Sequence, residues 1–466
     1  MQDGSREAAL CAPRESGRSS SGHGRVGLRA VAIVLAALLA AASSYAWRPA
    51  SSGDEGTVRD SSAIDGVGAS PSPDEVARLI TVFEVRVKDH TDALDYRFLG
   101  GLYLQRARAF GDVADYARAR AALERAIELR PADLETRTSI ATLHYTTHDF
   151  AGALDLAQAL LAEDPSRLSA VAIIGDARLE LGDYDGAATS YEALAEQAPN
   201  VAAVDARLAR LAFLRGRPDQ ARDFAGRAFL EAAAEGAFGA GLAWYAHLEA
   251  QIAFDRGDYG AAAAHEEQAL AAAPAYHVSL ASLARARAAQ GRATEAIGLY
   301  EKAIAVSPQP DYLSALGDLR SLAGDETRAR TEYAAVEAIA TLASGQQLYD
   351  RQLALFYADH DMNAARAVAI ARSSLERRGD VYGHDAYAWS LYKTGAFADA
   401  RASADRALAQ GTTDAKLWYH SGMISLALGD TGRARRELQR VLDTSPNFDP
   451  LQAPRARGAL ESLAGR

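Results

Sequence analysis

The chain of 466 residues is poor in cysteine, lysine and aromatic residues. Its one cysteine, Cys11, lies near the N-terminus, so the rest of the chain has no thiol for a disulfide bond, a thiolate metal site or a cysteine nucleophile. Lysine occurs only at positions 88, 302, 393 and 416, and the net charge is −11 without any block of basic residues. A chain of this charge is not expected to bind nucleic acid through its phosphates.

Catalytic signatures are missing as well. The sequence has no Gly-Lys-Ser/Thr phosphate loop, no G-x-S-x-G nucleophile turn and no H-E-x-x-H zinc motif. His144 and His148 are spaced to share one face of a helix, but a zinc site needs three or four ligands. We therefore expect a protein that is not an enzyme and that holds no metal or other cofactor.

The N-terminal part divides into three segments. Residues 1–29 are polar and basic, residues 30–47 carry no charge, and residues 48–72 are rich in Ser, Gly, Asp and Pro, as in a disordered linker. The uncharged segment is long enough for a transmembrane anchor, and its apolar part also fits a cleaved signal peptide or a buried helix. Arginines before this segment and acidic residues after it place the N-terminus inside the cell.

Two locations follow from this segment. An anchor predicts a single-pass protein of the cytoplasmic membrane whose main part lies outside the cytoplasm. A cleaved signal peptide predicts a secreted or periplasmic protein.

Alanine, in contrast, is abundant and recurs at a nearly fixed interval. Ten alanines follow one another at intervals of 33 to 41 residues, most often 34. A period of this length is typical of stacked helix–turn–helix units. The alanines are Ala119, Ala153, Ala187, Ala221, Ala262, Ala296, Ala329, Ala365, Ala400 and Ala434.

The residues around each alanine follow a common order. A small residue such as Gly175 lies 12 positions earlier, a Gly-Asp pair such as 182–183 often lies between, and a proline such as Pro199 often comes after. Glycine ends one helix, aspartate caps the next one, and proline cannot continue a helix interior. Each unit is therefore predicted to hold two antiparallel helices that cross closely where their side chains are small.

These positions together resemble the tetratricopeptide repeat (TPR) family over about residues 90–448, and the chain is similar to exported or membrane-anchored bacterial members. The resemblance implies an all-α fold, a right-handed superhelical solenoid of about ten helix–turn–helix repeats. We place the solenoid in residues 73–448 and a C-terminal capping helix in residues 449–466. The resemblance also implies that a protein or peptide ligand binds in a concave groove lined by the first helix of each unit.

One known partner class of the family is not expected here. Members that grip the tails of chaperones use asparagines on their first helices. Asparagine occurs in this chain only as Asn200, Asn363 and Asn447, all in predicted linkers or turns.

Counting helix phase from the small residues predicts which side chains face the groove. Aromatic residues accompanied by charged ones are typical anchors for a bound peptide. The alternative for each residue is that it packs between helices instead. The candidates are Tyr145, Arg210, Phe213, Trp244, Phe254, Arg285, Tyr357, Asp385, Trp389, Tyr392, Lys393 and Tyr419.

The sequence thus predicts a protein- or peptide-binding TPR scaffold that is tethered to the cytoplasmic membrane or exported across it. The alternative is an accessory or regulatory subunit of an envelope enzyme complex that assembles polysaccharide or cell wall.

Overall fold

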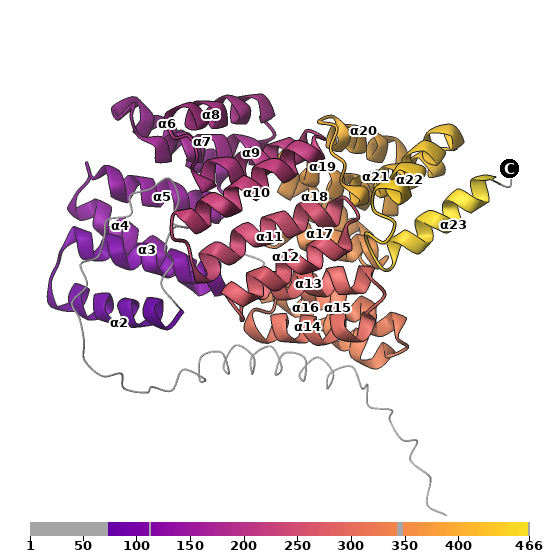
Figure 1. Cartoon of the computed structure of the whole chain (residues 1–466), viewed down its shortest axis with the longest axis horizontal. Coiled ribbons are helices and arrows are strands. Elements are labelled where there is room, and N and C mark those ends of the chain that lie inside the picture. Colours follow the sequence, from indigo (N-terminus) through magenta and orange to yellow (C-terminus); the bar gives the residue numbers. More distant parts are fainter. Residues whose placement is uncertain (1–72, 111–112, 343–347, 465–466) are drawn as a thin grey trace, which may run out of the picture.

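A computed structural model describes residues 73–110, 113–342 and 348–464 as 22 helices, and these residues contain no strand. The predicted all-α class is confirmed. Figure 1 shows the helices stacked in pairs along a curved array. The three N-terminal segments (1–29, 30–47 and 48–72) lie outside the described residues, as does the end of the predicted cap at 465–466. No helix within the described residues is long and apolar enough to cross a membrane.

The helices form ten consecutive pairs, as the alanine period predicts. The first helices are α3 (Ala93–Phe110), α5 (Leu134–Thr146), α7 (Leu168–Leu181), α9 (Ala202–Leu214), α11 (Gly239–Asp255), α13 (His277–Ala289), α15 (Pro310–Leu322), α17 (Asp350–Asp359), α19 (Val381–Lys393) and α21 (Ala415–Ala427). The second helices are α4 (Val113–Leu129), α6 (Phe150–Glu163), α8 (Tyr184–Gln197), α10 (Pro218–Ala234), α12 (Tyr259–Ala272), α14 (Ala293–Val306), α16 (Glu326–Leu342), α18 (Ala364–Arg377), α20 (Phe397–Leu408) and α22 (Thr431–Thr444). Single helices precede and follow the pairs, α2 (Pro73–Asp89) and α23 (Gln452–Ala464).

The turn inside a unit forms as the Gly-Asp pair predicts. Gly182 ends α7 in the left-handed region at φ 86°, and the Asp183 side chain accepts a hydrogen bond from the Gly186 N–H. The glycine conformation closes the first helix, and the aspartate satisfies a backbone donor that the second helix leaves free. Asp258 and Asp430 cap α12 and α22 in the same way.

The two helices of a unit cross closely where a small residue on one helix faces the other helix. Ala187 is fully buried, and a Cβ atom added to Gly175 would lie 2.5 Å from Cε1 of Tyr191, too close for any real contact. The same holds at Gly422, whose added Cβ would lie 2.8 Å from Cδ2 of Leu438. The small residues are therefore required by the distance between helix axes.

The eighth unit departs from the predicted phase. Ala365 is exposed, and the fully buried alanine at the crossing is Ala367. The turn before α18 ends with Asn363 in the left-handed region at φ 45°, so the helix starts later than the sequence interval implies. The predicted crossing alanine, Ala365, was therefore wrong, and the crossing lies two residues later at Ala367.

The array also contacts itself one superhelical turn later, along a line of contacts that we call the seam. The hydroxyl of Tyr184 accepts a hydrogen bond from the Val381 N–H at 2.9 Å, 197 residues away. The hydroxyl of Tyr259 likewise accepts from the Asn447 N–H at 2.8 Å and bonds to Ser445 Oγ at 2.8 Å. Both tyrosines begin a second helix, whereas Val381 begins α19 and both Ser445 and Asn447 lie in the linker between α22 and α23.

Glycines allow the backbones on the two sides of the seam to approach each other closely. An added Cβ on Gly182 would lie 2.5 Å from the carbonyl oxygen of Gly379, and one on Gly257 would lie 2.5 Å from that of Thr444. Gly216 meets Gly411 in the same manner. The yellow C-terminal helices therefore lie beside helices from the middle of the chain in Figure 1. A solenoid whose units touch only their neighbours, as sequence alone suggests, does not describe this fold.

Because of the seam, we expect two glycines with the same backbone conformation to differ in how much their replacement destabilises the protein. Gly257 and Gly291 both have left-handed φ, 78° and 77°, but an added Cβ at Gly291 meets nothing within 4 Å. Both Gly257→Ala and Gly291→Ala carry a left-handed strain of about 1–2 kcal/mol. Only Gly257→Ala also forces the seam apart, which is expected to lower the free energy of unfolding by about 1–3 kcal/mol more. Equal urea midpoints for the two variants would show that the seam adds nothing to stability.

Candidate functional site

Six of the predicted groove residues are buried. They lie between helices, so they cannot be exposed anchors and the groove prediction was wrong for them. Phe254 shows the reason: it sits at the end of α11, and its ring packs 5.1 Å from the ring of Tyr259 across the turn. The six are Phe213, Phe254, Tyr357, Asp385, Trp389 and Tyr419.

The other candidates keep some exposure. The side chains of Arg210 and Arg285 are 41% and 44% exposed, and Trp244 is 39% exposed. Tyr145 and Tyr392 are half-buried. Lys393 is nearly covered, because its ammonium lies 4.9 Å from the ring centre of Trp389 and 2.6 Å from Asp361. The six residues do not form one site, although Arg210 and Arg285 both belong to the inner chamber described below.

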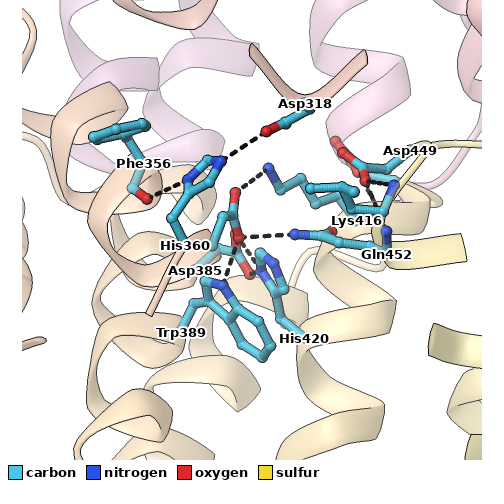
Figure 2. A network of polar contacts seen from close by, with 12 residues as sticks. Asp318, Phe356, His360, Asp385, Trp389, Lys416, His420, Asp449 and Gln452 are labelled. Atoms are coloured by element: carbon cyan, nitrogen blue, oxygen red, sulfur yellow. Dashed lines mark hydrogen bonds and ion pairs between the residues drawn. The ribbon is translucent and has the colours of Figure 1, made fainter. Parts of the chain in front are cut away.

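Polar side chains from four successive repeats instead meet in a network, shown in Figure 2. At its centre, Oδ1 of Asp359 accepts hydrogen bonds from Trp389 Nε1 at 2.7 Å and from Gln452 Nε2 at 2.8 Å. Its other oxygen, Oδ2, accepts one from Lys416 Nζ at 3.1 Å. One carboxylate at the end of α17 thus holds the first helices α19 and α21 and the capping helix α23.

These contacts set the charge states of the network. Burial raises the pKa of Asp359, but Lys416, His420 and the hydrogen bonds outweigh it, so the net pKa is lowered. Burial lowers the pKa of Lys416, but the carboxylates of Asp359 and Asp449 have the larger combined effect. The pKa of Lys416 is therefore raised above its ordinary value. Both groups are therefore ionised at neutral pH.

A second pair in the network is fully enclosed. Nδ1 of His420 lies 2.9 Å from Oδ1 of Asp385, and neither side chain is appreciably exposed. The imidazole stacks on Trp389 with ring centres 4.2 Å apart, and Trp389 stacks in turn on Tyr392 at 4.7 Å. Trp389 and His420 are therefore structural parts of the core.

A histidine at the edge of the network carries a positive charge. Nε2 of His360 lies 2.7 Å from Asp318 Oδ1, and Nδ1 lies 2.7 Å from the carbonyl oxygen of Phe356. Both partners are acceptors, so both ring nitrogens must carry hydrogen. Burial lowers the pKa of His360, but Asp318 and the carbonyl reverse this and leave it raised.

Charged and polar residues from distant units also act on one another electrostatically, and we call this group of residues the inner chamber. It contains Arg210 on α9, Asp255 on α11, Arg285 on α13, Tyr382 on α19 and Asp414 before α21. Burial raises the pKa of Tyr382, Asp414 and Asp255 raise it further, and Arg210 lowers it, so these three charged groups each lie within electrostatic reach of Tyr382. The seam brings together first helices that are more than 150 residues apart in sequence.

Charges in the inner chamber are only partly balanced. Arg285 pairs with Asp255 at 3.1 Å and covers the ring of Phe254 at 3.6 Å. Burial and the neighbouring Asp414 still raise the pKa of Asp255 to about 7, although Arg285 opposes them. Arg210 bonds to Glu180 at 2.5 Å.

Sequence reasoning missed Asp255, Asp359, Tyr382, Asp414 and Lys416. One signal was available: a carboxylate on one first helix is followed 30 residues later by its partner on the next. Glu180 and Arg210, Asp255 and Arg285, and Asp359 and Trp389 all have this interval. Adjacent first helices run parallel, and equivalent positions on them are most often 34 residues apart. A partner 30 residues later therefore lies about one helical turn before the equivalent position.

The residues considered for a metal have other contacts. His144 Nδ1 lies 2.6 Å from Asp149, and His148 sits in the turn at φ 63° with its ring stacked on Phe150. Within residues 73–110, 113–342 and 348–464, no three His, Cys, Asp or Glu side chains gather as metal ligands.

Comparison with known proteins places the chain in a family. One profile described as tetratricopeptide repeat matches residues 178–245, and a second with the same description matches residues 104–167, 247–311 and 386–449. These spans make up more than half of the chain, which therefore belongs to the tetratricopeptide repeat family. Proteins of this family are scaffolds for protein–protein interaction and are generally non-catalytic.

The chain is also similar to several solved structures at low identity. The chain is similar to MamA (21% identity, 37% of this chain and 97% of that chain, TM-score 0.31) and to PilW, a type IV pilus biogenesis factor (20%, 44% and 93%, 0.38). It is also similar to yeast Tom70 (14%, 84% and 93%, 0.33). No curated protein matches the chain by sequence. These likenesses concern the fold and not the partners.

Two tryptophans provide a test of the burial described above. Trp389 is 1% exposed and donates to Asp359, whereas Trp244 is 39% exposed. Trp389→Ala is expected to lower the free energy of unfolding by ~3–5 kcal/mol, because it leaves a cavity in the core and removes one of the hydrogen bonds to Asp359. Trp244→Ala is expected to cost about 1 kcal/mol or less. Similar losses in chemical denaturation would contradict the assignment of Trp389 to the core.

Proposed function

We propose that this protein is a scaffold that binds a protein or peptide partner in the inner chamber, outside the cytoplasm. The proposal rests on residues from both sides of the seam that act on one another electrostatically: Asp414, Asp255 and Arg210 each shift the pKa of Tyr382, and Arg285 pairs with Asp255 at 3.1 Å. First helices supply these residues, and in this family they line the concave face. The coarser role, a scaffold for protein interaction, follows from the family itself.

The chemistry of the chamber suits a polar, charged peptide. Arg210 and Arg285 hold their guanidinium groups with one carboxylate each and keep 41% and 44% of their side chains exposed. An arginine positioned in this way still has donors free for a backbone carbonyl or a carboxylate of a ligand. Asp255, with a pKa of about 7, gains full charge when a cationic group of the ligand approaches it.

The location in the proposal is supported by the N-terminal sequence. Residues 30–47 are uncharged, arginines precede them, and Asp54 and Glu55 follow. This arrangement favours a segment that directs the repeats across the cytoplasmic membrane, as an anchor or as a cleaved signal. Residues 48–72 then form the tether between the segment and the solenoid.

Partner binding is tested by crosslinking in intact cells with two matched double variants. Arg210→Ala with Arg285→Ala removes two exposed donors of the inner chamber. The control, Arg222→Ala with Arg328→Ala, removes two arginines whose side chains are 58% and 70% exposed on second helices. We expect the chamber variant to lose its crosslinked partner at least tenfold and the control to retain it. If circular dichroism shows that both variants are folded and both recover the crosslinked partner equally, the binding surface lies elsewhere.

The proposed location is tested by fusing a reporter that is active only outside the cytoplasm after Arg466. We expect activity from the full chain and none after deletion of residues 30–46, because the deletion removes the export segment. A full-length fusion that is inactive and fractionates with cytosol would refute the location and leave the binding role to be judged by the crosslinking result.

A further inference from the structure

Helix α2 closes the N-terminal end of the array, and Figure 1 shows it as the outermost helix there. On its inner face, Val76 and Ile80 share one buried cluster with Tyr103 of α3. Its outer face carries Val82, which is 47% exposed, and Val85, which is 52% exposed. Among the described helices, α2 is the one with two exposed large aliphatic side chains.

The two ends of the array differ in this respect. A solenoid needs terminal helices with a polar outer face to stay soluble as a single molecule. The C-terminal cap follows this rule, because none of the large apolar side chains described in α23 is exposed. Helix α2 does not follow it, so its outer face has the character of a contact surface.

Four exposed residues form a stripe along that outer face: Arg78, Val82, Val85 and Asp89. At 3.6 residues per turn, these positions fall within about 60° of one another around the helix. Arg78 makes only a distant contact with Glu75, at 3.9 Å, and its side chain is 71% exposed. Within residues 73–110, 113–342 and 348–464, no basic side chain pairs with Asp89. The stripe therefore has a cation at one end, two valines in the middle and an anion at the other end.

We propose that α2 docks on the α2 of a second copy of this chain, with the two helices antiparallel and a two-fold axis midway between Val82 and Val85. Each Val82 then meets Val85 of the second copy. Arg78 and Asp89 lie equally far from the axis, so each Arg78 meets Asp89 of the second copy. A two-fold interface requires a surface that is its own complement, and this stripe is one.

The charges select this arrangement over the others that would also cover the valines. A parallel pair would place Arg78 against Arg78 and Asp89 against Asp89. An antiparallel pair centred on Val82 would place Arg78 against Arg86. The same pair would place Asp89 against Glu75. Each of these arrangements brings like charges together, which is how helix pairs exclude a wrong orientation or register.

The interface is small and separate from the inner chamber. A single pair of helices buries less than the roughly 1,600 Å² of a standard interface, so we expect a dissociation constant on the order of micromolar. None of the residues in the stripe belongs to the inner chamber, so the dimer does not depend on the proposed function.

The test measures self-association of the full chain in detergent by sedimentation at increasing concentration. Arg78→Glu and Asp89→Arg should each weaken the dimer about tenfold, because like charges then meet twice in it. The double variant, Arg78→Glu with Asp89→Arg, should restore wild-type association. The matched control is Arg328→Glu, whose side chain is 70% exposed on α16. It should leave association unchanged.

A second comparison addresses the valines. Val85→Glu should weaken the dimer more than tenfold, whereas Leu230→Glu, at a residue 68% exposed on α10, should not. A chain that stays monomeric at all concentrations would overturn the proposal. So would association that none of the α2 variants changes, since contacts through residues 30–47 do not depend on charges in α2. Loss in both single charge variants without recovery in the double variant would refute the antiparallel register.

Disulfide crosslinking checks the orientation independently. Cys11 is the one cysteine of the chain, so Cys11→Ser gives a background without thiols. In that background, chains with Val82→Cys are mixed with chains with Val85→Cys and oxidised. The mixed disulfide should form faster than either like pair. Faster formation of the like pairs would indicate a parallel arrangement and contradict the proposal.

Discussion

The close approach of two helices at small side chains is the constraint on which the rest of this molecule depends. An alanine or glycine at each crossing fixes the distance between the helices of a pair, and the next pair nests on that one. Because the crossings recur at nearly equal intervals, equivalent residues of successive first helices lie side by side. A solenoid with a defined inner face follows from this one requirement.

The polar contacts are a consequence of that register. A carboxylate near the end of one first helix meets a donor one turn earlier on the next, so Glu180–Arg210, Asp255–Arg285 and Asp359–Trp389 share one interval. Each such pair joins two units that also share an apolar interface. The directional contacts fix how neighbouring units are rotated, whereas apolar packing alone tolerates small rotations.

The repeat architecture was accessible from sequence because it rests on local rules. Turn glycines, capping aspartates and buried alanines each act within one unit, and their period revealed ten helix pairs. The site was less accessible, since exposure depends on phase and on contacts across the superhelix. Counting helix phase from the small residues predicts that Trp389 and Tyr419 face the groove, yet both side chains are buried between first helices. The pairing of Tyr184 with Val381 has no local signal, because 197 residues separate them.

The seam gives the order of synthesis a physical meaning. Units built on α7 to α12 leave the ribosome long before the linkers at 379, 411 and 444–447 that cover their turns. Until those residues are made, Tyr184 and Tyr259 have no seam partners and the turns of three units face solvent. The middle of the protein reaches its final packing only when almost the whole chain is available. The linker at 444–447, near the C-terminus, supplies the last of these contacts.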